Sequence, residues 1–240
     1  MSDEIKNHTM KNTISYFQFL SVKKSTYLFL LLLLTACESD KKVRVLPIIG
    51  NYDVEYSTVD GKEVTDTIYP KIPEFSYLNQ DSVMISSKSM KGKVWIADFF
   101  FTSCPTICPK MTSQMKRLSF LTKDLEKYVQ FLSFTINPTK DQPSVLRKYI
   151  KLHGITAKNW YFFTGDEEQT HDLGVNYFNV FANKDIASEG GYAHSPAFVL
   201  VDTEGYVRGV YVGTETKQVD LLQKDLRKLL KYEYNYEISE

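Results

Sequence analysis

The sequence contains few of the side chains that most often carry out chemistry. Its 240 residues include three cysteines, four histidines and two tryptophans. Three cysteines are too few for the disulfide-rich frameworks that stabilise small secreted domains. An excess of either charge is also lacking, because 29 basic residues balance 29 acidic ones, and the basic residues form no stripe along the chain. A nucleic-acid partner is therefore not expected.

A membrane-spanning apolar run is also lacking near the N-terminus. Residues 27–34 are apolar and follow Lys23 and Lys24, but this run has the length of a signal-peptide core and is too short to span a bilayer comfortably. It ends in Leu-Thr-Ala-Cys at residues 34–37, which resembles the lipobox of bacterial lipoproteins. The resemblance implies cleavage before Cys37 and a lipid anchor on its sulfur, with the protein facing the periplasm. A signal anchor with an incidental cysteine is the alternative.

The chain length suits one domain plus a leader, and 43% hydrophobic residues allow a buried core. The hairpin expected before this domain rests on alternating apolar and polar residues on both sides of an Asp-Gly turn. We expect, in order, a lipoprotein signal peptide (1–36), a charged tether (37–50), a β-hairpin extension (51–70), an α/β domain (71–232) and a loosely held tail (233–240).

Hydrophobic periodicity predicts an α/β fold for the main domain. The nearly continuous apolar run at 93–101 is typical of a strand covered on both faces. Further strands are expected at 129–136, 160–163, 197–201 and 206–212, and helices at 111–125, 145–152, 167–178 and 216–230. Parallel strands joined by helical crossovers, followed by an antiparallel hairpin, resemble the thioredoxin arrangement. We therefore predict a thioredoxin-like sandwich with a central mixed sheet and an N-terminal β-hairpin extension.

With Cys37 assigned to lipid, Cys104 and Cys108 are the only remaining thiols. They lie where the first buried strand ends and a helix begins. Unpaired backbone N–H groups and the helix dipole at this position favour negative charge. A thiol ionises more readily there, and the thiolate is both a nucleophile and a metal ligand. Their four-residue spacing predicts two sulfurs on one helix face, suited either to redox chemistry or to metal binding.

Two sulfurs need a further ligand to complete a metal site. Thiolates select Cu(I) or Zn(II), and histidine suits both metals. His8 precedes the apolar run and is excluded, His153 is expected to cap a helix, and His171 lies on a predicted surface helix. His194 follows a glycine-containing segment, expected to be a flexible loop, that would face the cysteine pair in a thioredoxin-like sheet. It is the candidate third ligand, and a hydrogen-bonded loop histidine is the alternative.

Residues 99–109 read F-F-F-T-S-C-P-T-I-C-P. This stretch resembles the copper-site motif of the Sco/SenC family, F-x-x-T-x-C-P-x-x-C-P, and the resemblance extends over roughly residues 72–230. Members of this family are thioredoxin-like, bind copper through two cysteines and a histidine, and assist assembly of the dinuclear copper site of cytochrome c oxidase. The resemblance implies one copper ion, Cu(I) or Cu(II), held by Cys104, Cys108 and His194.

The resemblance implies a copper metallochaperone, a role that needs no enzymatic activity, with the copper-accepting subunit of a respiratory cytochrome c oxidase as partner. The alternative is a thiol–disulfide oxidoreductase that reduces the cysteines of the apo-oxidase subunit or of other extracytoplasmic proteins. In that case Cys104 attacks and Cys108 resolves the mixed disulfide. A peroxide-reducing enzyme is disfavoured, since the Thr-to-Cys spacing is one residue short. A structural disulfide would not need His194.

Three further positions bear on the site. Asn137 stands where the Sco/SenC family usually has aspartate, which puts in doubt an acidic group there that supports the metal ligands or docks a partner, whereas Asp141 is retained. Pro196 lies where thioredoxins carry a cis-proline beside their redox cysteines. A cis bond is therefore expected at Pro196, and it would favour disulfide exchange.

Overall fold

The computed structural model describes residues 44–185 and 192–238, which belong to one compact unit, Val43–Glu240. The predicted signal peptide, Cys37 and the first part of the predicted tether lie outside the described residues. Within 44–185 and 192–238, no helix combines the length and the apolar character needed to cross a membrane.

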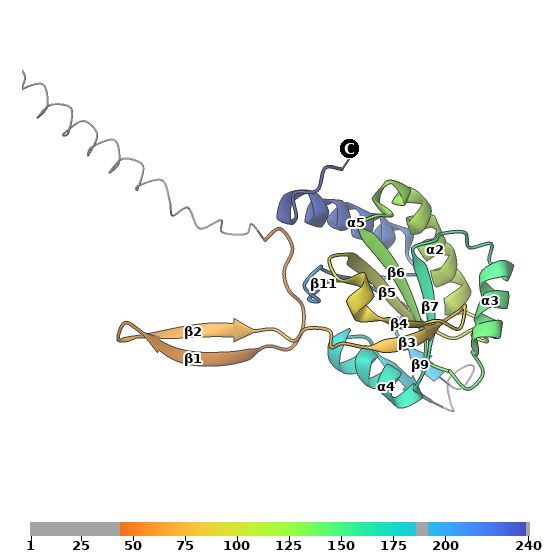
Figure 1. The fold of residues 1–240 in the computed structure, drawn as a ribbon, viewed down its shortest axis with the longest axis horizontal. Coiled ribbons are helices and arrows are strands. Elements are labelled where there is room, and N and C mark those ends of the chain that lie inside the picture. Colours follow the sequence, from red (N-terminus) through yellow and green to blue (C-terminus); the bar gives the residue numbers. More distant parts are fainter. Residues whose placement is uncertain (1–43, 186–191, 239–240) are drawn as a thin grey trace, which may run out of the picture. The chain divides into compact units, whose positions relative to one another are not determined.

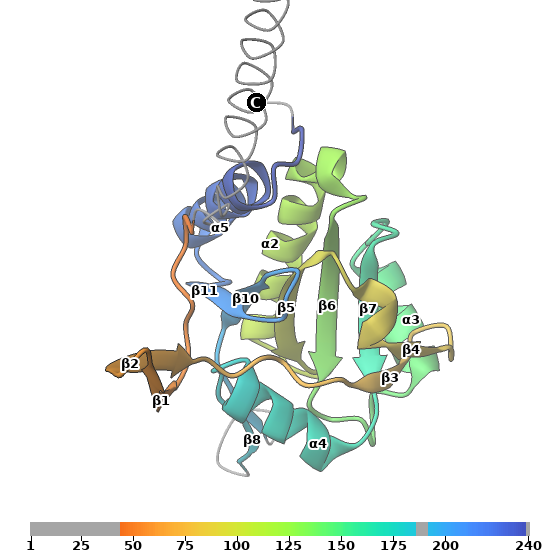
Figure 2. The same cartoon turned by 60° about the vertical axis from the view of Figure 1, so that its left-hand side comes forward.

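A mixed seven-stranded sheet forms the centre of the domain, with the strand order β11-β10-β5-β6-β7-β3-β4 (Figures 1 and 2). Strands β5, β6 and β7 are parallel, whereas β10, β11, β3 and β4 pair antiparallel with their neighbours. All residues of β5 and β6 are buried, as their apolar sequences predict. The strands are β3 (Ser76–Asn79), β4 (Met84–Ser86), β5 (Val94–Phe100), β6 (Val129–Thr135), β7 (Trp160–Thr164), β10 (Ala197–Val201) and β11 (Val207–Val212).

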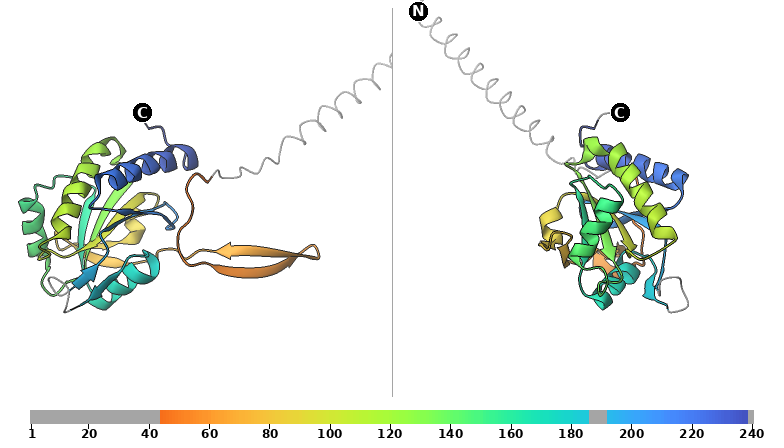
Figure 3. Two further views of the ribbon diagram at one scale, coloured as in Figure 1. Left: turned by 180° about the vertical axis from the view of Figure 1, so that it is seen from behind. Right: turned by 90° about the vertical axis from the view of Figure 1, so that its right-hand side faces the viewer.

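Helices cover both faces of this sheet, and Figure 3 shows α4 on the side away from α2 and α5. Successive side chains of a strand point to opposite faces. Phe100 of β5 contacts Tyr149 of α3, whereas Phe99 contacts Phe178, which follows α4. Thr112 of α2 hydrogen-bonds the same Tyr149, so α2 and α3 share a face. The helices are α2 (Ile107–Leu121), α3 (Pro143–Leu152), α4 (Glu167–Asp172) and α5 (Thr216–Lys228). The predicted thioredoxin-like α/β sandwich is confirmed.

Strands β1 (Asp53–Val59) and β2 (Lys62–Ile68) form a separate two-stranded antiparallel sheet, visible in Figure 1. The turn between them places Asp60 and Gly61 at φ angles of 51° and 74°. Positive φ at both central residues is the geometry that favours Asp-Gly in tight hairpins. Every residue of both strands is exposed, so the hairpin is held by its own backbone ladder.

Two expectations around His194 are wrong. The segment expected to be a flexible loop includes β9 (Tyr192–His194), which pairs antiparallel with β8 (Ala182–Lys184). Three-residue strands are too short to show the alternation that marks a strand in sequence.

The cis bond expected at Pro196 is the second of these. Among the described residues there is no cis peptide bond, so the bond before Pro196 is trans. The Pro196 carbonyl accepts a hydrogen bond from the Gly213 N–H at 2.6 Å, which extends the β10–β11 ladder.

Both ends of the described chain pack on the domain, where the sequence predicts a tether to residue 50 and a loose tail. The Glu233 carboxylate accepts hydrogen bonds from the backbone N–H groups of Val45 and Leu46. Tyr236 stacks on Tyr128 with 4.3 Å between ring centroids. The sequence pattern does not reveal these contacts because their partners lie more than 100 residues apart.

Candidate metal centre

Three side chains from two distant parts of the chain converge at one end of the sheet. Cys104 lies in the turn after β5, Cys108 in the first turn of α2, and His194 at the end of β9. Their sulfur and nitrogen atoms all lie within 4.8 Å of one another. The Cys108 Sγ is 3.3 Å from the His194 Nε2. The structure therefore brings together the three residues that the resemblance implies as metal ligands.

The backbone around the cysteines follows from two prolines. The Cys104 N–H donates to the Phe101 carbonyl at 3.2 Å, which closes a turn directly after β5. Pro105 comes next, and α2 begins at Ile107. Pro109 therefore falls in the first turn of the helix, where its missing N–H removes no intrahelical hydrogen bond. The short turn and the early helix start bring the Cys108 sulfur back toward Cys104.

The buried side chain of Asp141 holds the turn that leads to the cysteines. Its carboxylate accepts hydrogen bonds from the Thr102 N–H at 2.9 Å and from the Thr102 and Thr135 hydroxyls, both at 2.5 Å. Thr102 precedes the cysteines and Thr135 ends β6, so one carboxylate joins the cysteine turn to the sheet. Asp141 is 0% exposed. The role supported by these contacts is positioning rather than contact with a partner protein.

Asn137 belongs to the same hydrogen-bonded group as Asp141 and Thr135. Its N–H donates to the Thr135 hydroxyl at 3.1 Å, and its carbonyl accepts from the Asp141 N–H at 2.9 Å. Asn137 is buried, and its backbone shapes the turn that carries Asp141. Because these contacts use only the main chain of Asn137, aspartate at this position is not needed for them.

Replacing Asp141 by asparagine is expected to weaken metal binding by about 10- to 100-fold, the usual cost of changes behind the ligands. The amide keeps the size of the side chain but removes one acceptor oxygen and turns N–H groups toward the Thr102 and Thr135 donors. Competition against a chromophoric Cu(I) chelator measures the effect. The exposed Asp81→Asn is the matched control, and an affinity equal to that of the wild type in Asp141→Asn would refute the positioning role.

The pKa values of the two thiols are shifted in opposite directions. The hydrogen bond with Cys108 lowers the pKa of Cys104 to about 4, outweighing burial, and the N–H groups of Cys108 and Thr106 add to the effect. The same hydrogen bond, together with burial, raises the pKa of Cys108 well above its ordinary value. The pair therefore holds one proton over a wide pH range. A metal ion bound by both sulfurs must displace that proton, so binding strengthens as pH rises.

The His194 ring is held mainly by packing. The edge of the ring meets Phe101 with 5.7 Å between centroids, and Phe101 also contacts Tyr192 of the same strand. Within the described part of the chain, the His194 Nδ1 is buried without a hydrogen-bond partner. The other ring nitrogen, Nε2, faces the Cys108 sulfur, and an imidazole beside two sulfurs suits a soft metal ion such as Cu(I) or Zn(II).

The other described histidines have other partners. His153 is the C-cap of α3, as predicted, and its ring lies 4.2 Å from that of Tyr149. The His171 Nε2 lies 3.1 Å from the Ile136 carbonyl oxygen, and its ring contacts Tyr192. His171 thus supports the strand that carries His194 without joining the group of three.

Sequence reasoning missed Asp98, although a single aspartate within an apolar strand is a visible signal. It lies on β5 and is buried, and its carboxylate accepts a hydrogen bond from the Ser133 hydroxyl at 2.5 Å. Burial raises the pKa of Asp98 to about 7. Its negative charge also contributes to the raised pKa of Cys108. Asp98 is thus an ionisable group close enough to act electrostatically on the site.

Asp98→Asn is expected to change how stability depends on pH. The folded state keeps a proton on Asp98 up to a pKa of about 7, whereas the unfolded chain loses it near pH ~3.9. Folded protein thus binds more protons in this window, and its stability falls as pH rises from about 4 to 7. The variant lacks this fall and is more stable at pH 8 by up to roughly 4 kcal/mol. Urea unfolding at pH 5 and pH 8 measures it, and parallel profiles would exclude the effect.

The part of the chain that is similar to known proteins includes Cys104, Cys108 and His194. The model of the SCO1/SenC family matches residues 64–231. A candidate copper-binding protein of Stutzerimonas stutzeri is 30% identical over 162 residues, which cover 66% of this chain and 76% of the relative. A SCO1/SenC family lipoprotein from Bacillus anthracis str. Ames is 33% identical, with a TM-score of 0.61 and coverage of 66% and 94%. BsSco, described as having a disulfide switch and belonging to the Sco family of cytochrome c oxidase assembly proteins, is 33% identical, with a TM-score of 0.59 and coverage of 65% and 91%.

Proposed function

The chain belongs to the SCO1/SenC family, and from this premise we propose that it binds one copper ion through Cys104, Cys108 and His194. We propose further that it delivers this ion to the copper-accepting subunit of a respiratory cytochrome c oxidase. The observation that carries the proposal is the group of two sulfurs and one imidazole within 4.8 Å. The Stutzerimonas relative is described as a candidate copper-binding protein, and BsSco as a member of a family of cytochrome c oxidase assembly proteins.

The donor set suits a cargo ion more than a permanent structural one. Closed structural zinc sites use four protein ligands, whereas the group here offers three. A metal held by three ligands leaves room for an incoming ligand of the acceptor, so that the ion can pass by ligand exchange. Thiolate ligands stabilise Cu(I), and imidazole supports copper in either oxidation state. The half-buried His194 is the more accessible ligand, and both cysteines are buried.

His194→Ala tests the three-ligand site. We expect the wild type to bind one copper ion per chain and the variant to bind copper at least about tenfold more weakly, because only the thiolates remain. Titration of the reduced protein with Cu(I) under a competing chelator gives both stoichiometry and affinity. His153→Ala is the matched control, since His153 lies outside the group. Equal copper affinity in His194→Ala and in the wild type would rule out histidine as a ligand.

A thiol–disulfide oxidoreductase is the second candidate, favoured by the low pKa of Cys104. The Cys104 thiolate would attack a target disulfide, forming a mixed disulfide and releasing one target thiolate. Cys108 would then lose its proton and attack the Cys104 sulfur, which releases the second target thiolate and leaves the chain oxidised. The trans bond at Pro196 removes the argument that a cis bond would have given this candidate. A reduction potential well below that of the target cysteines, with turnover in the absence of copper, would establish it.

We propose in addition that Cys37 carries a lipid that anchors the chain to a bacterial membrane, with the domain facing the periplasm. Support comes from the lipobox-like residues 34–37 and from the similarity to the Bacillus anthracis protein, which is described as a lipoprotein. Radiolabelled palmitate incorporated into the wild type and absent from Cys37→Ser would support the anchor. Equal labelling of both chains would contradict it.

A further inference from the structure

The β1–β2 hairpin presents two chemically different faces. The register places Val54 opposite Thr67 and Tyr56 opposite Thr65, so these four residues share one face. Tyr56 is 76% exposed. The opposite face, termed the acidic face, consists of Asp53, Glu55, Ser57, Val59, Lys62, Val64, Asp66 and Ile68. Three acidic residues and one lysine give this face a net charge of −2.

The acidic face costs the hairpin stability. Glu55 lies directly opposite Asp66, and like charges in directly opposed positions destabilise a strand pair. An isolated two-stranded hairpin is already marginally stable in water. Three exposed apolar side chains share this face: Ile68 is opposite Asp53, Val64 lies between the Glu55–Asp66 pair and Lys62, and Val59 is opposite Lys62. A cationic surface that also carries an apolar side chain would cover both features and relieve the repulsion.

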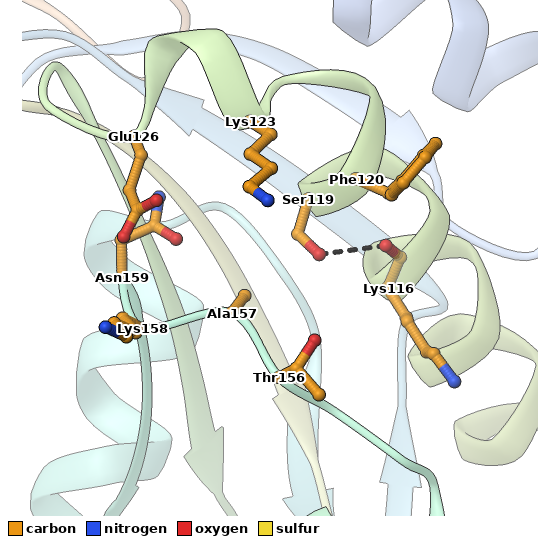
Figure 4. Close-up of a pocket in the computed structure, with 9 residues that line it drawn as sticks. All are labelled: Lys116, Ser119, Phe120, Lys123, Glu126, Thr156, Ala157, Lys158 and Asn159. Carbon is orange, nitrogen blue, oxygen red and sulfur yellow. Dashed lines mark hydrogen bonds between the residues drawn. The ribbon is translucent and has the colours of Figure 1, made fainter.

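The same chain offers such a surface at the far end of α2. A hollow of about 560 Å³ lies between the end of this helix and the segment before β7 (Figure 4). The residues that matter here are Lys116, Lys123, Lys158, Glu126, Phe120 and Ala157. Three lysines and one glutamate give this lysine hollow a net charge of +2. Phe120 beside them is 77% exposed, which is unusual for a large aromatic ring.

We propose that the acidic face of one copy docks on the lysine hollow of a second copy of this chain. The net charges of −2 and +2 match, and Phe120 provides an apolar contact for Val64 and its neighbours. The hairpin does not cover the hollow of its own chain, because every residue of both strands is exposed. Pairing of two hairpins is disfavoured because both are acidic. Face and hollow are different surfaces, so copies assemble head to tail.

This contact is separate from the proposed copper site. Cys108 lies in the first turn of α2 and Phe120 in its last, about 18 Å apart along the helix at ~1.5 Å per residue. Association would therefore leave uncovered the end of the sheet that carries the cysteines and His194. The proposal does not depend on copper, and its failure would leave the proposed function unaffected.

Charge reversal on each surface tests the contact. Sedimentation velocity of the full chain in non-ionic detergent is expected to show protein mass rising with concentration at low salt and falling as salt screens the charges. The variants Glu55→Lys/Asp66→Lys and Lys123→Glu/Lys158→Glu should each associate at least about tenfold more weakly, equivalent to ~1.4 kcal/mol. An equimolar mixture of the two should recover association, because the reversed face then meets the reversed hollow.

Glu63→Lys is the matched control, since Glu63 lies on the other face of the hairpin. It should associate like the wild type. All substituted residues are surface groups, and far-ultraviolet circular dichroism checks that each variant is folded. A wild type that stays monomeric at low salt overturns the proposal. A mixture no more associated than either variant alone, or a Glu63→Lys effect equal to that of the double variants, overturns it as well.

Discussion

Replacing Cys108 by serine is expected to lower the affinity for Cu(I) by more than about 100-fold, because changes behind the ligands already cost about 10- to 100-fold. The Cys108 sulfur lies beside the His194 Nε2 and within 4.8 Å of the Cys104 sulfur. A serine hydroxyl is a hard oxygen donor that Cu(I) binds poorly. The side chain is 1% exposed, so the loss cannot be compensated by a nearby external ligand without rearrangement. Anaerobic chelator competition measures the change.

Two controls separate ligation from general damage. Ser103→Ala, at an exposed position next to Cys104, should bind copper like the wild type. Cys104→Ser should lose affinity to a similar degree as Cys108→Ser, since both thiolates are proposed ligands. If Cys108→Ser retained the affinity of the wild type while Cys104→Ser lost it, the site would have a single sulfur ligand.

Arg208→Ala is expected to destabilise the fold by about 3–5 kcal/mol, the cost of removing one partner of a buried ion pair. The Arg208 guanidinium is 2.5 Å from the Glu233 carboxylate and 3.0 Å from that of Asp202, and all three side chains are almost fully buried. It also donates to the carbonyl groups of Leu46 and Pro47. The substitution leaves two buried carboxylates without their cationic partner. It also removes contacts that hold both ends of the described chain on the domain. Urea unfolding at pH 7 measures the loss.

Arg117→Ala is the matched control. Arg117 pairs with Asp220 at 2.8 Å, but both side chains are more than a third accessible to water, so the expected loss is at most about 1 kcal/mol. The combination Arg208→Met, Asp202→Asn and Glu233→Gln removes the charges together and should recover part of the stability lost in Arg208→Ala. If Arg208→Ala unfolded at the same urea concentration as Arg117→Ala, the buried network would not contribute to stability.

Patterns that are local in sequence predicted the framework well. The apolar runs of β5 and β6 indicated strands buried on both faces, and the Asp-Gly pair placed the turn between β1 and β2. The helix expected at 145–152 is α3, and it begins at Pro143, a residue suited to the first turn of a helix. Each of these features depends on neighbouring residues, so the sequence carries enough information to identify it.

Features that depend on distant partners were not predictable in the same way. The support of Thr102 by Asp141 joins residues 39 positions apart, and the bond from Arg208 to Leu46 spans 162 positions. No periodicity records such a pairing. The strand that carries His194 has only three residues, which is below the length at which alternation is visible. The site residues could therefore be named from motif and resemblance, whereas the contacts that hold them required the fold.

X-ray absorption spectroscopy of the copper-loaded protein tests the central claim most directly. The proposed site predicts two sulfur atoms and one imidazole nitrogen around a single copper ion in the wild type. The same measurement on His194→Ala should show the two sulfurs retained and the imidazole signal lost. A wild-type spectrum with one sulfur or without imidazole, or an unchanged imidazole signal in His194→Ala, would contradict the assignment of Cys104, Cys108 and His194 as the copper ligands.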